Sequence, residues 1–236
     1  MEDEATALLR SSLRAADHAP DSQSHASAEE LVFHVDDRLY LGTEHGAASQ
    51  AAFDVLRVGL VINLTSGGGK VANHFAAEAK YINYELADHP GENILTRGIR
   101  EGTQELREWL ADGTRTRPAA LVHCVAGLSR SATVVVAWMM SSREMSLLEA
   151  VTHVTERRGR RLRINPSFWM ALALWERELR SLPTGTPPSF DFTPCWVEHF
   201  GELGFPRELI EHALVKVGDW VDFESAFEAL LMGENA

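Results

Sequence analysis

The sequence predicts an α/β fold, a three-layer sandwich in which helices cover both faces of a central, mostly parallel sheet, followed by a small three-helix bundle. Two apolar runs, residues 119–122 and 133–138, flank a short loop, as a buried strand and a buried helix would. Residues 59–65 form another short, β-branched run that ends at a glycine cluster, which is typical of a buried strand. A Pro- and Gly-containing stretch at residues 181–189 then separates an acidic C-terminal region.

Composition limits the class of protein. With 236 residues, of which 45% are hydrophobic, the chain has room for one good-sized domain and a small second one. A net charge of −12 argues against nucleic acid or an anionic membrane as a general partner. The two cysteines, Cys124 and Cys195, are too few for a disulfide framework and favour a reducing, cytoplasmic location. No signal peptide or run of about 18 apolar residues occurs, and residues 1–30 are predicted to be a disordered tail.

The loop between the two apolar runs carries the residues that indicate chemistry. It reads His123, Cys124, Val125, Ala126, Gly127, Leu128, Ser129, Arg130 and Ser131. A loop that closes onto the start of a helix can turn its backbone N–H groups inward and form a cup for the oxygens of a phosphoryl group. Arg130 can hold two of those oxygens with its planar guanidinium. Cys124 lies at the base of the cup, where the arginine and the N–H dipoles favour a nucleophilic thiolate. The alternative is a buried cysteine with only a packing role.

This loop resembles the His-Cys-x5-Arg-Ser/Thr signature of cysteine-dependent protein tyrosine phosphatases, and its interior is most similar to that of the atypical dual-specificity branch. The resemblance spans residues 31–181 and implies a protein tyrosine phosphatase-like sandwich, with a first strand and turn at 35–42 and a helix around 98–110. Residues 81–88 alternate like a strand and end at Asp88, which the resemblance implies is the general acid. Asn165 precedes Pro166, whereas the family has the reverse order, so no catalytic role is assigned to Asn165.

In the chemistry that the resemblance implies, the Cys124 thiolate attacks phosphorus and forms a phosphocysteine while Asp88 donates a proton to the leaving oxygen. Asp88 then acts as base for water, and the Ser131 hydroxyl eases the departure of sulfur. Residues 125–129 and Arg130 bind the phosphoryl group, and His123 orients the loop. No metal or other cofactor is needed, and the scattered histidines lack the spacing of a zinc site.

The predicted function is a dual-specificity phosphoprotein phosphatase that hydrolyses phosphotyrosine and phosphoserine or phosphothreonine. The loop interior contains no lysine, which favours a phosphoprotein over a polyanionic phospholipid. One alternative keeps the enzyme but makes the substrate a sugar, lipid or RNA phosphate. A second alternative is a low-activity adaptor that binds phosphate or ubiquitin.

Residues 156–163 contain five arginines. Three interpretations remain open: a basic funnel that concentrates phosphosubstrates, a solvated helix end whose charge suits the helix dipole, and a nuclear localisation patch, which adds the nucleus to the predicted location.

Residues 194–236 follow a linker predicted at 182–193 and form the predicted second domain. From residue 191 onward the chain has ten acidic residues and two basic ones, and helical patterns occur at 195–202, 206–217 and 222–232. This arrangement resembles a ubiquitin-associated (UBA) domain, which implies a ubiquitin-binding surface formed by Leu203, Gly204, Phe205, Leu230 and Leu231. The alternative is a bundle docked on the catalytic domain, with Phe205 in the shared core.

Overall fold

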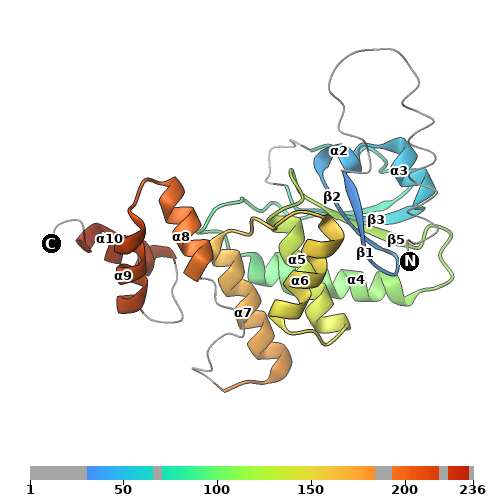
Figure 1. The fold of residues 1–236 in the computed structure, drawn as a ribbon. Coiled ribbons are helices and arrows are strands. Elements are labelled where there is room, and N and C mark those ends of the chain that lie inside the picture. The colour runs from blue at the N-terminus through green and yellow to red at the C-terminus, as the bar shows by residue number, and fades with distance from the viewer. Residues whose placement is uncertain (1–30, 66–70, 184–192, 218–222, 234–236) are drawn as a thin grey trace, which may run out of the picture.

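The computed structural model describes residues 31–65, 71–183, 193–217 and 223–233 (Figure 1). The tail predicted at 1–30 and most of the linker predicted at 182–193 lie outside the described residues. Within the described part of the chain, no helix is both long enough and apolar enough to cross a membrane.

A five-stranded sheet forms the middle layer of the α/β region. Its strands are β1 (Val32–Asp36), β2 (Leu39–Gly42), β3 (Val58–Asn63), β4 (Lys80–Asn83) and β5 (Ala119–His123). Their order across the sheet is β1-β2-β5-β3-β4. β1 pairs antiparallel with β2 at one edge, and all other neighbours run parallel. The predicted mostly parallel sheet is confirmed, and the carboxyl ends of four strands lie together, where ligands of open α/β sheets bind.

Helices cover both faces of this sheet, as the sequence predicts (Figure 1). α2 (Glu44–Ala47) and α3 (Gln50–Val55) pack on one face, where Phe53 of α3 lies in a buried cluster with Val61 and Leu121. The other face is covered by η2 (Leu95–Glu101), α4 (Gly102–Ala111), α5 (Arg130–Ser142), α6 (Leu147–Arg158) and α7 (Pro166–Arg180). Because both faces are covered, every residue of β3 and β5 is buried.

The central helix α5 anchors the loop of residues 124–129 at one end. Residues 130–140 of this helix are all buried, and the run Val134, Val135 and Val136 packs in the main apolar cluster. A helix that is apolar on all sides must lie inside the protein. The loop that joins β5 to α5 is therefore held between two buried elements.

Two predicted elements are shorter or different in the structure. The strand predicted at 81–88 pairs only over Lys80–Asn83, because after Tyr84 the chain leaves the sheet and Leu86 N–H bonds to the Tyr84 carbonyl at 3.0 Å instead. Asp88 consequently lies on a connecting segment rather than on a strand. The helix predicted around 98–110 begins as the π-helix η2 and continues as α4.

The C-terminal residues form three helices, α8 (Thr193–Glu202), α9 (Arg207–Val217) and α10 (Phe223–Gly233). Their own core contains the buried side chains of Trp196, Phe200, Ile210, Ala213, Ala226 and Leu230. Phe205 packs inside this bundle, with its ring centroid 6.1 Å from those of both Phe200 and Phe227. α8 lies beside α7 (Figure 1), and the main apolar cluster runs continuously from α5, α6 and α7 into this bundle.

Burial corrects one residue of the predicted ubiquitin surface. Leu230 is only 1% exposed, so it supports the bundle core and cannot contact a partner. Leu203 and Leu231 are exposed, Phe205 is half-buried, and Gly204 forms the turn with φ +97°. Leu230 is buried because it lies one helical turn after the buried Ala226 and on the same face of α10.

Candidate active site

The loop that follows β5 places a cysteine at the base of a small cup. Cys124 is buried at the end of β5, and the Ser131 hydroxyl in the first turn of α5 lies 3.2 Å from its Sγ. A hydroxyl donor at this distance stabilises negative charge on sulfur. The two residues are seven positions apart but meet because the loop returns to the point where it started.

Two neighbouring segments, residues 42–44 and Arg163, hold the loop in shape. Gly127 has φ +66°, and a Cβ at this position would lie 2.9 Å from the carbonyl oxygen of Gly42, so only glycine fits without strain. The backbone N–H of Glu44 donates to the Val125 carbonyl at 3.0 Å, and the N–H of Arg163 donates to the Leu128 carbonyl at 3.0 Å. Two of the outward carbonyls are thus bonded by the rest of the protein, which leaves the loop free to turn N–H groups inward.

Arg130, the first residue of α5, is buried beside the cup. Its Nη1 donates to the Leu86 carbonyl at 3.1 Å, which fixes the guanidinium plane. Its Nε makes no hydrogen bond among the described residues but forms an ion pair with Asp88, 3.5 Å from Oδ2. A buried guanidinium with an unused donor is suited to bind an anionic oxygen.

Asp88 is held over the same cup by two hydrogen bonds. Ser129 Oγ donates to Asp88 Oδ1 at 2.7 Å, and Asn165 Nδ2 donates to the same oxygen at 3.0 Å. Ser167 Oγ also donates to the Pro90 carbonyl, which ties the segment after Asp88 to the start of α7. The structure therefore brings Cys124, Arg130 and Asp88 together.

Asn165 is the site residue that the sequence analysis missed. Its side-chain oxygen caps α7 by accepting from the Phe168 N–H at 3.1 Å, while its amide nitrogen reaches Asp88. An asparagine directly before a proline that begins a helix is a strong N-cap signal. That signal predicts the cap but not the second bond, which depends on where the Asp88 segment lies.

His123 supports the loop from inside the sheet. The side chain is fully buried, and its Nδ1 lies 3.3 Å from the Cys124 carbonyl, which can only accept, so Nδ1 carries the proton. Burial lowers the pKa of His123 to about 4, and this effect outweighs the hydrogen bond to the Cys124 carbonyl, which raises the pKa. The predicted role of His123 in orienting the loop stays a prediction, and its contact with the Cys124 carbonyl is compatible with that role.

A model of the family "Dual specificity phosphatase, catalytic domain" matches residues 39–178, which is more than half of the chain. The chain belongs to this family. Human dual specificity protein phosphatase 14 is 32% identical over 141 residues, which cover 60% of this chain and 67% of that protein. Human dual specificity protein phosphatase 4 is 32% identical over 146 residues, which cover 62% of this chain and 34% of the relative. The chain is accordingly a phosphatase of the dual-specificity class, a group of hydrolases.

Solved structures of dual-specificity phosphatases share the fold. Human DUSP28 is 26% identical with a TM-score of 0.53, and the match covers 63% of this chain and 95% of that one. A mouse dual specificity phosphatase complexed with zinc tungstate is 23% identical with a TM-score of 0.59, and the match covers 69% of this chain and 96% of that one.

The arginines of residues 156–163 do not form one continuous exposed basic surface. Arg158 is buried, its guanidinium carbon lies 3.8 Å from the centroid of the Phe33 ring, and its Nη2 donates to the Ala126 carbonyl at 3.4 Å. Arg161 pairs with Glu198 at 3.0 Å and Arg163 pairs with Glu202 at 2.5 Å, both on α8. Three of the five arginines are therefore engaged by the protein itself, which weakens the interpretation as an open basic funnel.

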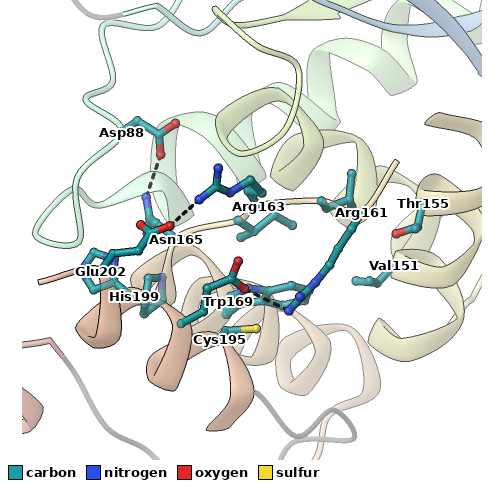
Figure 2. A pocket seen from close by; sticks show the side chains of 14 residues that line it. Asp88, Val151, Thr155, Arg161, Arg163, Asn165, Trp169, Cys195, His199 and Glu202 are labelled. Atoms are coloured by element: carbon teal, nitrogen blue, oxygen red, sulfur yellow. Dashed lines mark hydrogen bonds and ion pairs between the residues drawn. The ribbon is translucent and has the colours of Figure 1, made fainter. Parts of the chain in front are cut away.

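A cavity of about 310 Å³ adjoins Asp88. It lies between residues 161–166 and α8, so the C-terminal bundle forms one of its walls (Figure 2). Trp169 and Ile164 contribute apolar surface, and His199 and Cys195 face it from α8. Burial lowers the pKa of His199 from its usual value. Among the described residues, no group of three His, Cys, Asp or Glu side chains could hold a metal ion.

Proposed function

We propose that this phosphatase hydrolyses phosphotyrosine and phosphoserine or phosphothreonine in phosphoproteins through a phosphocysteine on Cys124. The observation that carries the proposal is the convergence of three groups on one cup: a buried thiol with a hydroxyl donor 3.2 Å away, a buried guanidinium with an unused N–H, and a carboxyl group 3.5 Å from that guanidinium. This is a nucleophile, an anion clamp and an acid in one place.

In the first step, the Cys124 thiolate attacks phosphorus opposite the ester oxygen. The S–P bond forms as the P–O bond breaks, and Asp88 gives its proton to the leaving oxygen. Arg130 and the loop N–H groups hold the three non-bridging oxygens, whose charge they stabilise in the transition state. The product alcohol or phenol departs, and Cys124 carries the phosphoryl group.

In the second step, water attacks phosphorus on the side that the alcohol has left. Asp88, now a carboxylate, takes a proton from that water, and the S–P bond breaks to release inorganic phosphate. The electron pair returns to Cys124 sulfur, where the Ser131 hydroxyl donates to the thiolate. The hydrogen bond from Ser131 is stronger to the thiolate than to the uncharged sulfur of phosphocysteine, so it stabilises the leaving thiolate.

Two features support a phosphoprotein over a polyanionic substrate. The exposed part of the loop is Val125 and Ala126, which carry no charge. The nearby Arg161 and Arg163 are already paired with carboxylates of α8. A ligand with several phosphate groups needs several unpaired cations, and the site presents few. The position of Asp88 beside Arg130 also favours an enzyme over an adaptor, because binding of phosphate alone does not require a general acid.

Hydrolysis of 4-nitrophenyl phosphate by the full chain, without added metal and with a chelator present, tests this proposal. We expect turnover that disappears in Cys124→Ser and falls strongly in Asp88→Asn. Phosphotyrosine and phosphothreonine peptides then test dual specificity. Turnover that survives Cys124→Ser would contradict the thiolate mechanism, and a folded, reduced protein with no activity would favour an adaptor.

We also propose that α8–α10 bind ubiquitin through Leu203, Gly204 and Leu231. Leu203 is 56% exposed and Leu231 is 43% exposed, and both lie where the resemblance to a ubiquitin-associated domain implies the ubiquitin-binding surface. Titration of isotope-labelled ubiquitin with the full chain, followed by NMR, tests this. We expect binding that is lost in Leu203→Asp and kept in Val215→Asp, which alters an exposed apolar position on α9. Equal loss in both variants, or no binding by the unmodified chain, would contradict it.

A further inference from the structure

Helix α8 is joined to the rim of the active site by two ion pairs. Arg161 Nη2 lies 3.0 Å from Glu198 Oε2, and Arg163 Nη2 lies 2.5 Å from Glu202 Oε1. Figure 2 shows Arg163 at the end of the cavity near Asp88, Arg161 at the other end near Thr155, and α8 with Glu202 and Cys195 opposite them. The two glutamates are four residues apart, so they lie on the same face of the helix, one turn from each other.

The segment that these glutamates hold is the one that positions the catalytic groups. The Arg163 N–H donates to the Leu128 carbonyl of the phosphate loop at 3.0 Å. Two residues later, Asn165 Nδ2 donates to Asp88 Oδ1 at 3.0 Å. Residues 161–165 therefore form ion pairs with α8 on one side, and on the other side they bond to the phosphate loop and to Asp88.

We propose that Glu198 and Glu202 are positioning residues for the general acid, so that the C-terminal bundle is part of the catalytic unit. This inference rests on the proposed function of Asp88. By pulling Arg161 and Arg163 toward α8, the glutamates fix the segment that carries Asn165, and Asn165 in turn fixes the Asp88 carboxyl group. α8 lies outside residues 39–178, so the device uses residues beyond the matched catalytic domain.

The expected effect is modest because both pairs are exposed. The side chains of Arg163 and Glu202 are 59% and 58% exposed, and such pairs are weak and screened by salt. Loss of both pairs is expected to lower catalysis about two- to fivefold. The loss should also shrink at high ionic strength, where the pairs contribute little in the unmodified chain.

The leaving group separates a positioning role from a general loss of stability. A poor leaving group such as phenol needs the proton from Asp88 more than 4-nitrophenol does. In full-length Glu198→Lys/Glu202→Lys, we expect kcat/KM to fall about two- to fivefold for phenyl phosphate and less for 4-nitrophenyl phosphate. Glu208→Lys, an exposed change on α9 with the same charge difference per site, serves as the control and leaves both values unchanged.

A charge exchange tests the contact itself. Arg163→Glu alone repels Glu202 and lowers kcat/KM for phenyl phosphate, whereas Arg163→Glu combined with Glu202→Arg restores it. Amide hydrogen exchange of residues 86–92 gives a readout that needs no turnover: exchange is expected to be faster in the double lysine variant and unchanged in Glu208→Lys.

The outcomes separate this inference from the proposed function. If the unmodified chain shows no activity that depends on Cys124, the proposed function fails, and the hydrogen exchange of residues 86–92 still decides whether α8 restrains the Asp88 segment. Equal losses for both substrates, unchanged hydrogen exchange, or no rescue by the charge exchange would overturn the positioning role. Higher activity in the lysine variant would also overturn it, because α8 would then inhibit the site.

Discussion

Lowering the pH below 6.5 is expected to destabilise the folded chain through His123. Burial lowers the pKa of this histidine from 6.5 to about 4. In the unfolded chain the imidazole is in water and takes up a proton near its usual pKa. Below pH 6.5 the unfolded state therefore binds a proton that the folded state does not bind, and the equilibrium shifts toward unfolding.

The size of the effect follows from the two pKa values. Their difference is 6.5 − 4 = 2.5 units, and each unit corresponds to about 1.4 kcal/mol, so the loss is about 3–4 kcal/mol. The free energy of unfolding contains this contribution fully above pH 6.5, loses it as the pH falls toward 4, and loses no more below that. A loss of this size is a large part of the stability of an ordinary domain.

Urea unfolding of His123→Asn beside the unmodified chain measures this contribution. Asparagine retains an N–H donor for the Cys124 carbonyl but has no proton to gain. We expect the free energy of unfolding of the variant to fall less steeply between pH 6.5 and about 4. His45→Asn controls for the removal of an exposed histidine. Parallel pH profiles for the unmodified chain and His123→Asn would refute the reasoning.

Three further substitutions test separate parts of the site. Ser131→Ala removes the donor to sulfur, and we expect release of phosphate from Cys124 to slow about tenfold or more, seen in rapid-quench experiments as a burst of alcohol followed by slow turnover; unchanged steady turnover would contradict this. Asn165→Ser keeps a helix cap but cannot reach Asp88, so kcat/KM for phenyl phosphate is expected to fall about three- to tenfold with little change in melting temperature; equal losses for phenyl and 4-nitrophenyl phosphate would count against it. Gly127→Ala places a Cβ 2.9 Å from the Gly42 carbonyl oxygen in a left-handed backbone conformation, and we expect both lower activity and a loss of about 1–3 kcal/mol in chemical unfolding; an unchanged variant would mean that the loop can relax.

The phosphate loop could be predicted from sequence because its chemistry is local. Cys124, Arg130 and Ser131 lie within eight residues of each other, on the loop that joins a buried strand to a buried helix and on the first turn of that helix. Their spacing in the sequence therefore largely determines their geometry. Asp88 is farther along the chain, and the alternating pattern before it predicted a longer strand than β4. The structure ends that strand at Asn83 because only the parallel pairing with β3 supports it.

Residues that depend on tertiary placement were harder to predict. The arginine cluster gave three interpretations because the sequence does not show that Arg158 stacks on Phe33 or that Arg163 meets Glu202 on α8. Asn165 was given no role because its second partner lies 77 residues away. The burial of Leu230, by contrast, depends on local helix geometry: Leu230 lies four residues after Ala226, so both residues share one face of the helix.

The measurement that tests the central claim most directly is mass spectrometry of the full chain quenched during turnover. We expect one phosphoryl group on the peptide that contains Cys124, with more of it in Ser131→Ala than in the unmodified chain, and none in Cys124→Ser. A phosphoryl group on any other residue, or rapid turnover with no phosphorylated intermediate in Ser131→Ala, would contradict the phosphocysteine mechanism.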